Sequence, residues 1–138
     1  MSSTSSSRPL EGLTFLVDES VGAKIVPAAL RELGATVITV AERFGQGTPD
    51  EHWLAEAGAA NWIVITRDRM ILKRPNELAA LRNANVRAFA LTGGAQTGEA
   101  AADLLRRRAE KIRNYCQSEK PPFLVTVMAS QMKWEKLR

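Results

Sequence analysis

The stretches Leu13-Thr14-Phe15-Leu16-Val17-Asp18 and Trp62-Ile63-Val64-Ile65-Thr66-Arg67-Asp68 indicate how this chain folds. Each is a short apolar run, rich in β-branched residues and closed by charged residues, and this pattern is typical of a buried strand. In a parallel sheet covered by helices, neighbouring strands bring the residues that follow them to one edge, where such folds bind ligands. We therefore expect Asp18 and Asp68 to lie side by side at that edge.

Strand and helix patterns alternate along the rest of the chain. Further strands are expected at 36–40, 86–91 and 123–127, and helices at 21–33, 48–60, 75–84 and 97–116. The helix at 21–33 is expected to bury one face, and the helix at 97–116 an apolar stripe. The residues of the first face are Val21, Ile25, Ala28 and Leu33, and those of the stripe are Ala101, Leu104, Leu105, Ala109, Ile112 and Cys116. Five strands separated by helices predict an α/β fold, a three-layer α/β/α sandwich with a mostly parallel central sheet.

The length of 138 residues fits a single domain, because domains of about 100 to 150 residues are the commonest. Residues 1–10 are serine-rich and nearly free of apolar side chains, so they are predicted to be a disordered tail. Residues 11–138 are predicted to form the domain. Nineteen Lys and Arg against fifteen Asp and Glu give a net charge of +4, which is compatible with a polyanionic partner.

The compartment is inferred from cysteine content and hydropathy. A single cysteine, Cys116, forms no internal disulfide, and the chain opens with no charged-then-apolar leader, so we expect a reducing cytoplasm. No segment approaches the roughly 18 consecutive apolar residues of a membrane-spanning helix, and we expect no membrane association.

Only four aspartates occur in the chain, and three of them, Asp18, Asp50 and Asp68, are placed to meet at one edge. Adjacent carboxylates repel and raise each other's pKa, so a site that gathers them usually contains a cation or shares a proton. Mg²⁺ and Mn²⁺ prefer oxygen ligands and leave positions open for water and phosphate. The three aspartates are therefore predicted to hold a divalent metal and to serve phosphodiester hydrolysis.

Each aspartate also has an ordinary structural explanation. Thr48, Pro49 and Glu51 form a capping-box pattern, so Asp50 is also explained as an acid in the first turn of a helix. For Asp18, the structural explanation is that Asp18 or Ser20 merely caps the helix that follows. Asp68 is explained as a loop acid paired with a neighbouring arginine.

Basic residues flank the predicted edge and form the candidate substrate-binding set. They are Arg67, Arg69, Lys73 and Arg74. Cations beside a metal site suit the phosphates of a nucleic acid. A second basic group at 106–113 is explained as well by a solvated helix face. His52, the only histidine, is expected at the surface, and Trp134 is expected in a polar tail where it serves a partner contact.

With these residues in place, the chain resembles the compact PIN-like family, which includes the VapC-like toxin nucleases. The resemblance covers roughly residues 13–92 and is carried by Phe15-Leu16-Val17-Asp18-Glu19-Ser20, by Gly47-Thr48-Pro49-Asp50-Glu51-His52-Trp53-Leu54 and by Ile63-Val64-Ile65-Thr66-Arg67-Asp68. It implies Mg²⁺- or Mn²⁺-dependent cleavage of RNA, with Asp18 and Asp68 as principal ligands and Asp50 as the third acid. It also implies inhibition by a cognate antitoxin protein.

The chain departs from larger members of that family after its fourth strand, where Thr92-Gly93-Gly94 stands and no fourth aspartate is evident. A receiver domain that accepts a phosphoryl group is the first alternative, because Asp18, Asp68 and Thr92 follow a similar order; however, no lysine ends the fifth strand. The second alternative is a catalytically silent PIN-like module that binds RNA or a partner. A homodimer is compatible with the chain, although no motif indicates one.

Overall fold

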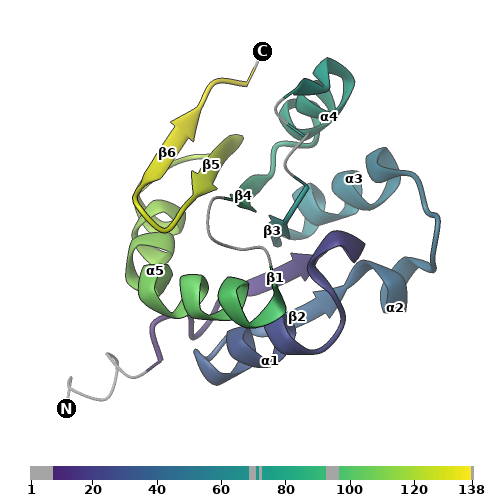
Figure 1. Ribbon diagram of the computed structural model, residues 1–138. Helices are drawn as coiled ribbons and strands as arrows, with labels where there is room; N and C mark the ends of the chain where they lie inside the picture. The colour runs from purple at the N-terminus through teal and green to yellow at the C-terminus, as the bar shows by residue number, and fades with distance from the viewer. Residues whose placement is uncertain (1–7, 69–70, 72, 93–96, 138) are drawn as a thin grey trace.

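The computed structural model describes residues 8–137, apart from 69, 70, 72 and 93–96, and the chain forms a six-stranded sheet of order β2-β1-β3-β4-β5-β6 (Figure 1). The strands are β1 (Thr14–Val17), β2 (Thr36–Thr39), β3 (Ile63–Thr66), β4 (Arg87–Leu91), β5 (Phe123–Val127) and β6 (Met132–Glu135). β1 to β5 pair in parallel, and β6 pairs antiparallel with β5.

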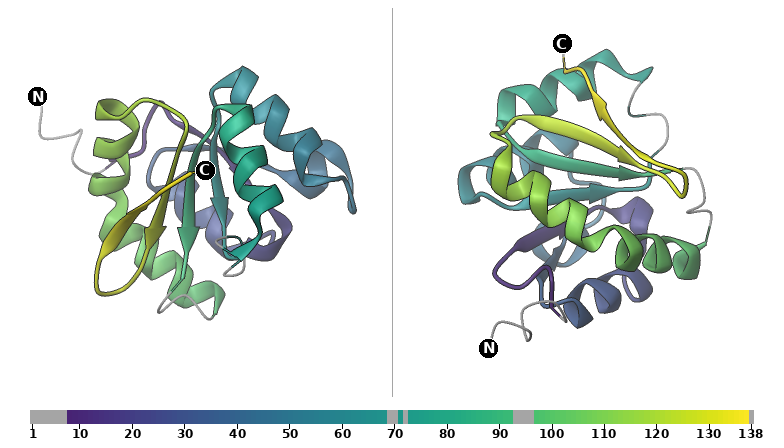
Figure 2. Two further views of the ribbon diagram at one scale, coloured as in Figure 1. Left: turned by 90° about the horizontal axis from the view of Figure 1, so that it is seen from above. Right: turned by 90° about the vertical axis from the view of Figure 1, so that its left-hand side faces the viewer.

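Helices cover both faces of this sheet, as the view from above in Figure 2 shows. The helical elements are the 3₁₀ turn η2 (Glu19–Val21), α1 (Ile25–Glu32), α2 (Val40–Phe44), α3 (Asp50–Ala60), α4 (Pro75–Ala84) and α5 (Gly98–Ser118). Side chains of α1 and α5 pack with one face, and side chains of α2, α3 and α4 pack with the other. The predicted three-layer α/β/α fold is confirmed.

Alternation along the strands divides the core into two parts. In β1, Phe15 and Val17 join the cluster under α1 and α5, whereas Leu16 joins the cluster under α3 and α4. All three side chains are buried. A continuous apolar run therefore serves both layers, as expected for a central parallel strand.

Two predictions about strands were wrong in detail. About five strands were expected, but Met132 to Glu135 form a sixth, because the basic tail turns back beside β5. The strand predicted at 36–40 ends at Thr39, whose hydroxyl accepts from the Glu42 backbone N–H and so caps α2. Trp134 thus lies on an edge strand, where its ring stacks on Tyr115 at 6.1 Å between centroids.

The face predicted to be buried by the first helix was wrong in part. Val21 is buried and Leu33 packs against the core, whereas Ile25 and Ala28 are exposed. Gly22, at φ 91°, separates η2 from α1, so the helix begins only at Ile25. Its buried residues are Val26, Pro27, Ala29 and Leu30, while Ile25 is 43% exposed. The stripe predicted for α5 is confirmed in full, and Cys116 lies in the core as its last member.

The prediction of a disordered tail over residues 1–10 was wrong at its last residue, Leu10. Residues 1–7 lie outside the described residues, but Leu10 is completely buried and its N–H donates to the Leu33 carbonyl at 2.9 Å. Leu10 therefore belongs to the folded domain and packs near the C-terminal end of α1. No helix in the described ranges is long and apolar enough to cross a membrane.

A close contact between α3 and α4 sets the position of both helices. A Cβ placed on Gly58 of α3 would lie 1.8 Å from the Ala84 carbonyl oxygen at the end of α4, so only glycine permits this approach. The amino ends of the same two helices carry Asp50 and Glu77. This packing therefore helps to determine where two acidic side chains stand.

Candidate functional site at the carboxyl edge of the sheet

Asp18 and Asp68 follow two strands that are direct neighbours. β1 and β3 pair in parallel with Val17 opposite Ile65, and the Asp18 N–H donates to the Ile65 carbonyl at 3.2 Å. The predicted meeting of the two strand ends at one edge is therefore what the fold produces. Neither side chain is fully exposed.

Both carboxylate oxygens of Asp18 accept hydrogen bonds. Oδ1 accepts from the backbone N–H of Ser20 at 3.0 Å and from its hydroxyl at 2.5 Å, and Oδ2 accepts from the Thr66 hydroxyl at 2.6 Å. Asp18 does cap η2, as the structural alternative predicted, but this role uses only one oxygen. The second oxygen is held by a side chain from the neighbouring strand, which a cap does not need.

Thr66 links the two acidic segments. Its side chain is 2% exposed, donates to Asp18 and accepts from the Asp68 backbone N–H at 3.1 Å. The Arg67 N–H in turn donates to the Ser20 hydroxyl at 2.9 Å. Sequence reasoning treated Thr66 only as the end of a strand, although a threonine at a buried strand end beside an aspartate was the signal for this role.

Asp50 stands at the first residue of α3, but the predicted capping box is absent. Pro49 is the N-cap residue with no side-chain bond, and the Thr48 hydroxyl instead donates to the carbonyls of Phe44 and Gly45 at 2.8 and 2.9 Å. Thr48 therefore closes the preceding turn. Asp50 is left as an acid in the first turn, where the helix dipole favours it.

Asp68 forms an ion pair with an arginine that was predicted to bind substrate. Arg74 Nη1 lies 2.5 Å from Asp68 Oδ2 and 3.4 Å from Glu77 Oε2. The expected partners were the sequence neighbours Arg67 and Arg69, of which Arg69 lies outside the described residues. Arg74 reaches Asp68 because the N-terminal end of α4 returns to the strand end.

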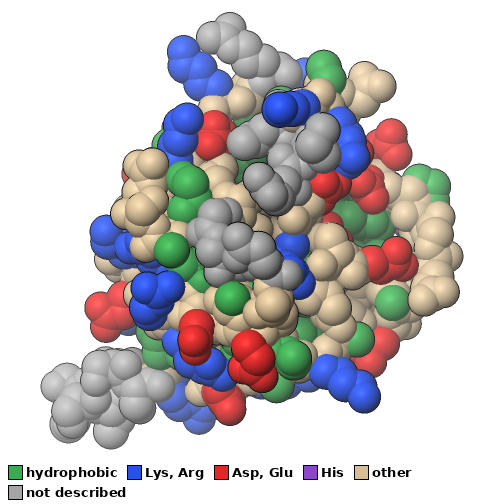
Figure 3. Space-filling view, viewed as in Figure 1, with side chains coloured by type: hydrophobic (Ala, Val, Ile, Leu, Met, Phe, Trp, Pro, Cys, Tyr) green, Lys and Arg blue, Asp and Glu red, His purple; other side chains and the backbone are tan. Residues whose placement is uncertain are grey.

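The three aspartates line one cavity. It has a volume of about 180 Å³, and Asp18, Asp50 and Asp68 contribute to its wall together with Ser20 and Thr48. A smaller adjoining space of about 20 Å³ is lined by the same aspartates and by Glu77. Figure 3 shows acidic side chains gathered on the α3 and α4 side of the molecule, with basic side chains beside them.

Glu77 is a site residue that sequence reasoning missed. It lies in the first turn of α4, directly after the basic segment that follows Asp68. A fourth acid was sought after the fourth strand, whereas this glutamate stands earlier in the chain and reaches the cavity through the packing of α4. The sequence did contain one signal for Glu77, because it is a glutamate in the first turn of the first helix after the strand that leads to Asp68.

The electrostatic environment resists negative charge. Burial raises the pKa of Asp18 and the charge of Asp50 raises it further, although the hydrogen bonds from Ser20 and Thr66 oppose this shift. Burial, Glu51 and Asp68 raise the pKa of Asp50, and burial likewise raises the pKa of Glu77 while Arg74 opposes it. A bound cation would relieve this mutual repulsion.

The donor set fits a hard divalent cation in chemistry. All charged acceptors that line the cavity are carboxylates. The ligands typical of zinc lie elsewhere, because the only histidine, His52, is exposed and the only cysteine, Cys116, lies in the core. Within the described residues, however, no group of three or more Asp, Glu, His or Cys side chains could hold a metal ion as it stands. Arg74 supplies positive charge at Asp68 in this arrangement.

The other basic residues singled out in the sequence fall into two groups, one near Asp68 in the sequence and one on α5. Lys73 is exposed, and Arg67 is half-buried. On α5, Arg106 pairs with Glu32 and Asp103, and Arg108 donates to the carbonyls of Met128 and Ala129. These two arginines of the second basic group therefore hold neighbouring elements together. Gly93 and Gly94 lie outside the described residues.

Comparison with known proteins identifies the family. A model described as "PIN like domain" matches residues 13–93, which is more than half of the chain. The chain belongs to the PIN-like domain family. The resemblance predicted for residues 13–92 is thereby confirmed, and the matched segment includes Asp18, Asp50, Asp68 and Glu77.

A curated relative from Mycobacterium tuberculosis (strain ATCC 25618 / H37Rv) carries the name "Putative ribonuclease VapC45". It is 30% identical to this PIN-like chain over 79 residues, which is 54% of the chain and 57% of the relative. The chain thus spans little more than half the length of this relative. No solved structure gives a significant match.

Proposed function

We propose that this PIN-like protein is a Mg²⁺- or Mn²⁺-dependent endoribonuclease, a phosphodiester hydrolase that forms the toxin half of a toxin-antitoxin pair. One observation carries the proposal: Asp18, Asp50 and Asp68 come from three separate segments and line the same cavity of about 180 Å³. Membership of the PIN-like family and the similarity to a protein named as a ribonuclease support it.

In this proposal Asp18, Asp50 and Asp68 hold the cation, and Glu77 adds a fourth carboxylate beside them. When bound, the cation would polarise a scissile phosphate and make water easier to ionise. The chain contributes a prepared ligand: Ser20 and Thr66 fix the orientation of the Asp18 carboxylate through bonds to both of its oxygens.

The basic residues near Asp68 in the sequence would bind the RNA. Arg67, Arg69, Lys73 and Arg74 follow or precede the acidic strand end, and arginine matches phosphate oxygens with two parallel donors. Arg74 would change partners, because a cation at Asp68 removes the reason for its present ion pair. It would then contact the phosphate of the substrate.

The partners follow from the same assignment. The substrate is RNA in the cytoplasm, and a cognate antitoxin protein would restrain cleavage. A homodimer is a further proposal that oligomeric-state measurements in solution would test.

The experiment is a metal titration of purified protein with end-labelled RNA, run beside Asp68→Asn. We expect strand scission that saturates with Mg²⁺ or Mn²⁺, is lost with chelator, and is absent from the variant although its circular dichroism matches wild type. Cleavage by Asp68→Asn at the wild-type rate would overturn the site. RNA binding without cleavage at any metal concentration would favour the silent PIN-like module.

The receiver alternative is tested in the same preparation with acetyl phosphate. A receiver would form an acid-stable, hydroxylamine-labile aspartyl phosphate, whereas the nuclease would form none. The residues after β5, Met128 to Gln131, include no lysine, which disfavours the receiver because that fold uses such a cation beside its phosphoryl group.

A further inference from the structure

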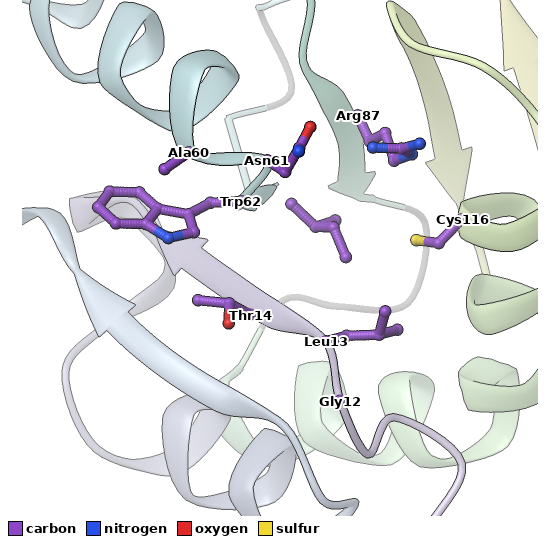
Figure 4. Close-up of a pocket in the computed structure, with 9 residues that line it drawn as sticks. Gly12, Leu13, Thr14, Ala60, Asn61, Trp62, Arg87 and Cys116 are labelled. Carbon is purple, nitrogen blue, oxygen red and sulfur yellow. The ribbon is translucent and has the colours of Figure 1, made fainter.

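A second cavity lies at the opposite, amino edge of the sheet. Its volume is about 460 Å³, within the range of small-molecule sites. The side chains that matter here are Leu13, Thr14, Asn61, Trp62, Arg87 and Cys116 (Figure 4). Trp62 stands on one side of it, and Arg87 and Cys116 stand on the other.

This cavity is separate from the acidic one. Thr14 opens β1 and contributes to the wall at the amino edge, whereas Asp18 follows the last residue of the same strand and contributes at the carboxyl edge. Four residues of extended chain span roughly 13 Å. No residue lines both cavities.

Arg87 gives the cavity its charge. It is the first residue of β4, next to Ile63 on β3 and Phe123 on β5, and its guanidinium takes part in no ion pair within the described ranges. Its Nε atom is buried and lacks a hydrogen-bond partner. The residues of the wall include no aspartate or glutamate.

The one candidate counter-ion in the wall is excluded. Cys116 faces the same space, but burial raises the pKa of its thiol to about 12, so the thiol is neutral at physiological pH. Among the described residues, Arg87 is therefore a positive group at a strand start with no ion-pair partner. A long side chain can carry its charge to solvent, yet that arrangement leaves the buried Nε unexplained.

The rest of the wall selects the kind of anion. A guanidinium binds phosphate through parallel N–H donors. Leu13 and Trp62 offer apolar and aromatic surface, and Asn61 and Thr14 carry polar groups that can address the edge of a heterocycle. Because Trp62 and Arg87 stand on opposite sides, an elongated ligand with a ring at one end and an anion at the other fits the cavity.

We propose that the amino-edge cavity binds a phosphorylated small molecule of the nucleoside monophosphate class, with its phosphate on Arg87 and its base beside Trp62. This site is independent of the proposed nuclease activity, because it uses none of the acidic residues. It gives the domain a means of sensing a nucleotide at one edge of the sheet while the other edge carries the carboxylates.

The test is isothermal calorimetry of adenosine 5′-monophosphate with wild type, Arg87→Met and Arg82→Met, in the presence of EDTA. Chelation removes any nucleotide binding through a metal at the acidic edge. Arg82 is exposed on α4, so its variant is a matched loss of one positive charge. We expect Arg87→Met to weaken binding by about 10- to 100-fold and Arg82→Met to leave it unchanged.

Two further ligands separate the two halves of the proposal. Adenosine lacks the anion and inorganic phosphate lacks the base, so both are expected to bind more weakly than the monophosphate. Trp62→Phe is expected to abolish the fluorescence change caused by the nucleotide while calorimetric binding persists. If inorganic phosphate bound as tightly as the monophosphate, the proposed contact between the base and Trp62 would be overturned.

Other outcomes overturn the whole proposal. These are no saturable binding of the monophosphate by wild type, or equal binding by wild type and Arg87→Met. Thermal unfolding distinguishes lost binding from misfolding. Without nucleotide, Arg87→Met should melt at or above the wild-type temperature because the variant removes a buried donor that has no partner. When nucleotide is added, the melting temperature should rise for wild type and Arg82→Met but not for Arg87→Met.

Discussion

The two edges of one sheet contrast in how their charged groups are arranged. At the carboxyl edge, Asp18 is bonded through Ser20 and Thr66, and Asp68 is paired with Arg74. At the amino edge, Arg87 carries a charge for which the described protein supplies no ion-pair partner. The same backbone architecture thus presents clustered carboxylates at one end and, at the other, an arginine with no ion-pair partner among the described residues.

The contrast teaches how each edge is suited to a different ligand. Carboxylates that raise one another's pKa are relieved by a cation, and hydroxyl donors keep one of them oriented before that cation arrives. An unpaired guanidinium is relieved by an anion. If both proposals hold, a substitution at one edge should abolish ligand binding there and leave binding at the other edge unchanged.

The largest expected effect is a complete separation of the two edges by single substitutions. Asp18→Asn should lower RNA cleavage by well over the roughly 10- to 100-fold that loss of a supporting residue causes, because it removes a ligand itself. It should leave nucleotide binding in EDTA unchanged. Paired cleavage and calorimetry assays measure both properties, and a loss of both in one folded variant would mean that the edges are not independent.

Thr66→Val should have the next largest effect. It keeps the shape of a buried side chain but removes the donor to Asp18 Oδ2 and the acceptor for the Asp68 N–H. We expect cleavage to fall about 10- to 100-fold and stability to fall by about 1–3 kcal/mol. Thr66→Ser retains the hydroxyl and is the matched control. Equal activity in the valine variant would show that Asp18 needs no support from β3.

Arg74→Met should change two properties in opposite directions. Loss of the ion pair removes one cation that competes for Asp68, so the midpoint for Mg²⁺ should improve a few-fold. Loss of a phosphate-binding cation should raise KM for RNA. Magnesium titration and initial rates separate the two. Arg82→Met, on the same helix but remote from Asp68 in sequence, serves as the control. A weaker metal midpoint in Arg74→Met would contradict this account.

The smallest expected effect is a pH dependence of stability in the metal-free protein. Raised pKa values for Asp18, Asp50 and Glu77 mean that these groups bind protons more readily in the folded state. Their contribution to the free energy of unfolding should therefore increase as pH falls from 7, and level off below the ordinary carboxyl values, near 3.8 for aspartate.

Urea unfolding at several pH values measures this dependence, with Asp50→Asn as the test variant. The amide cannot ionise, so the buried charge is removed, and this offsets the lost interaction of a first-turn carboxylate with the helix dipole. This variant should keep wild-type stability or exceed it at pH 7 and show a shallower slope. Its cleavage activity should be impaired. Asp103→Asn, on α5 and outside the cavity, is the control. An unchanged slope in Asp50→Asn would assign the pH dependence to other groups.

The sequence by itself determined the elements with strong periodicity and clear boundaries. Pro75 at the first position of α4, the stripe of α5 and the apolar run of β5 required only local physics. The order of strands and helices also placed Asp18 and Asp68 at one edge, because parallel strands must deliver their ends together. The family resemblance followed from the same segments.

Other features were decided by the tertiary structure. Arg74 pairs with Asp68 because α4 packs back on the strand end, and Glu77 reaches the cavity by the same packing. The face that α1 buries depended on where Gly22 ends η2. Strand β6 formed because the C-terminal segment pairs with β5 at the edge of the sheet. Local patterns record which side chains prefer burial, but the choice of partner depends on distances between segments that only the folded chain sets.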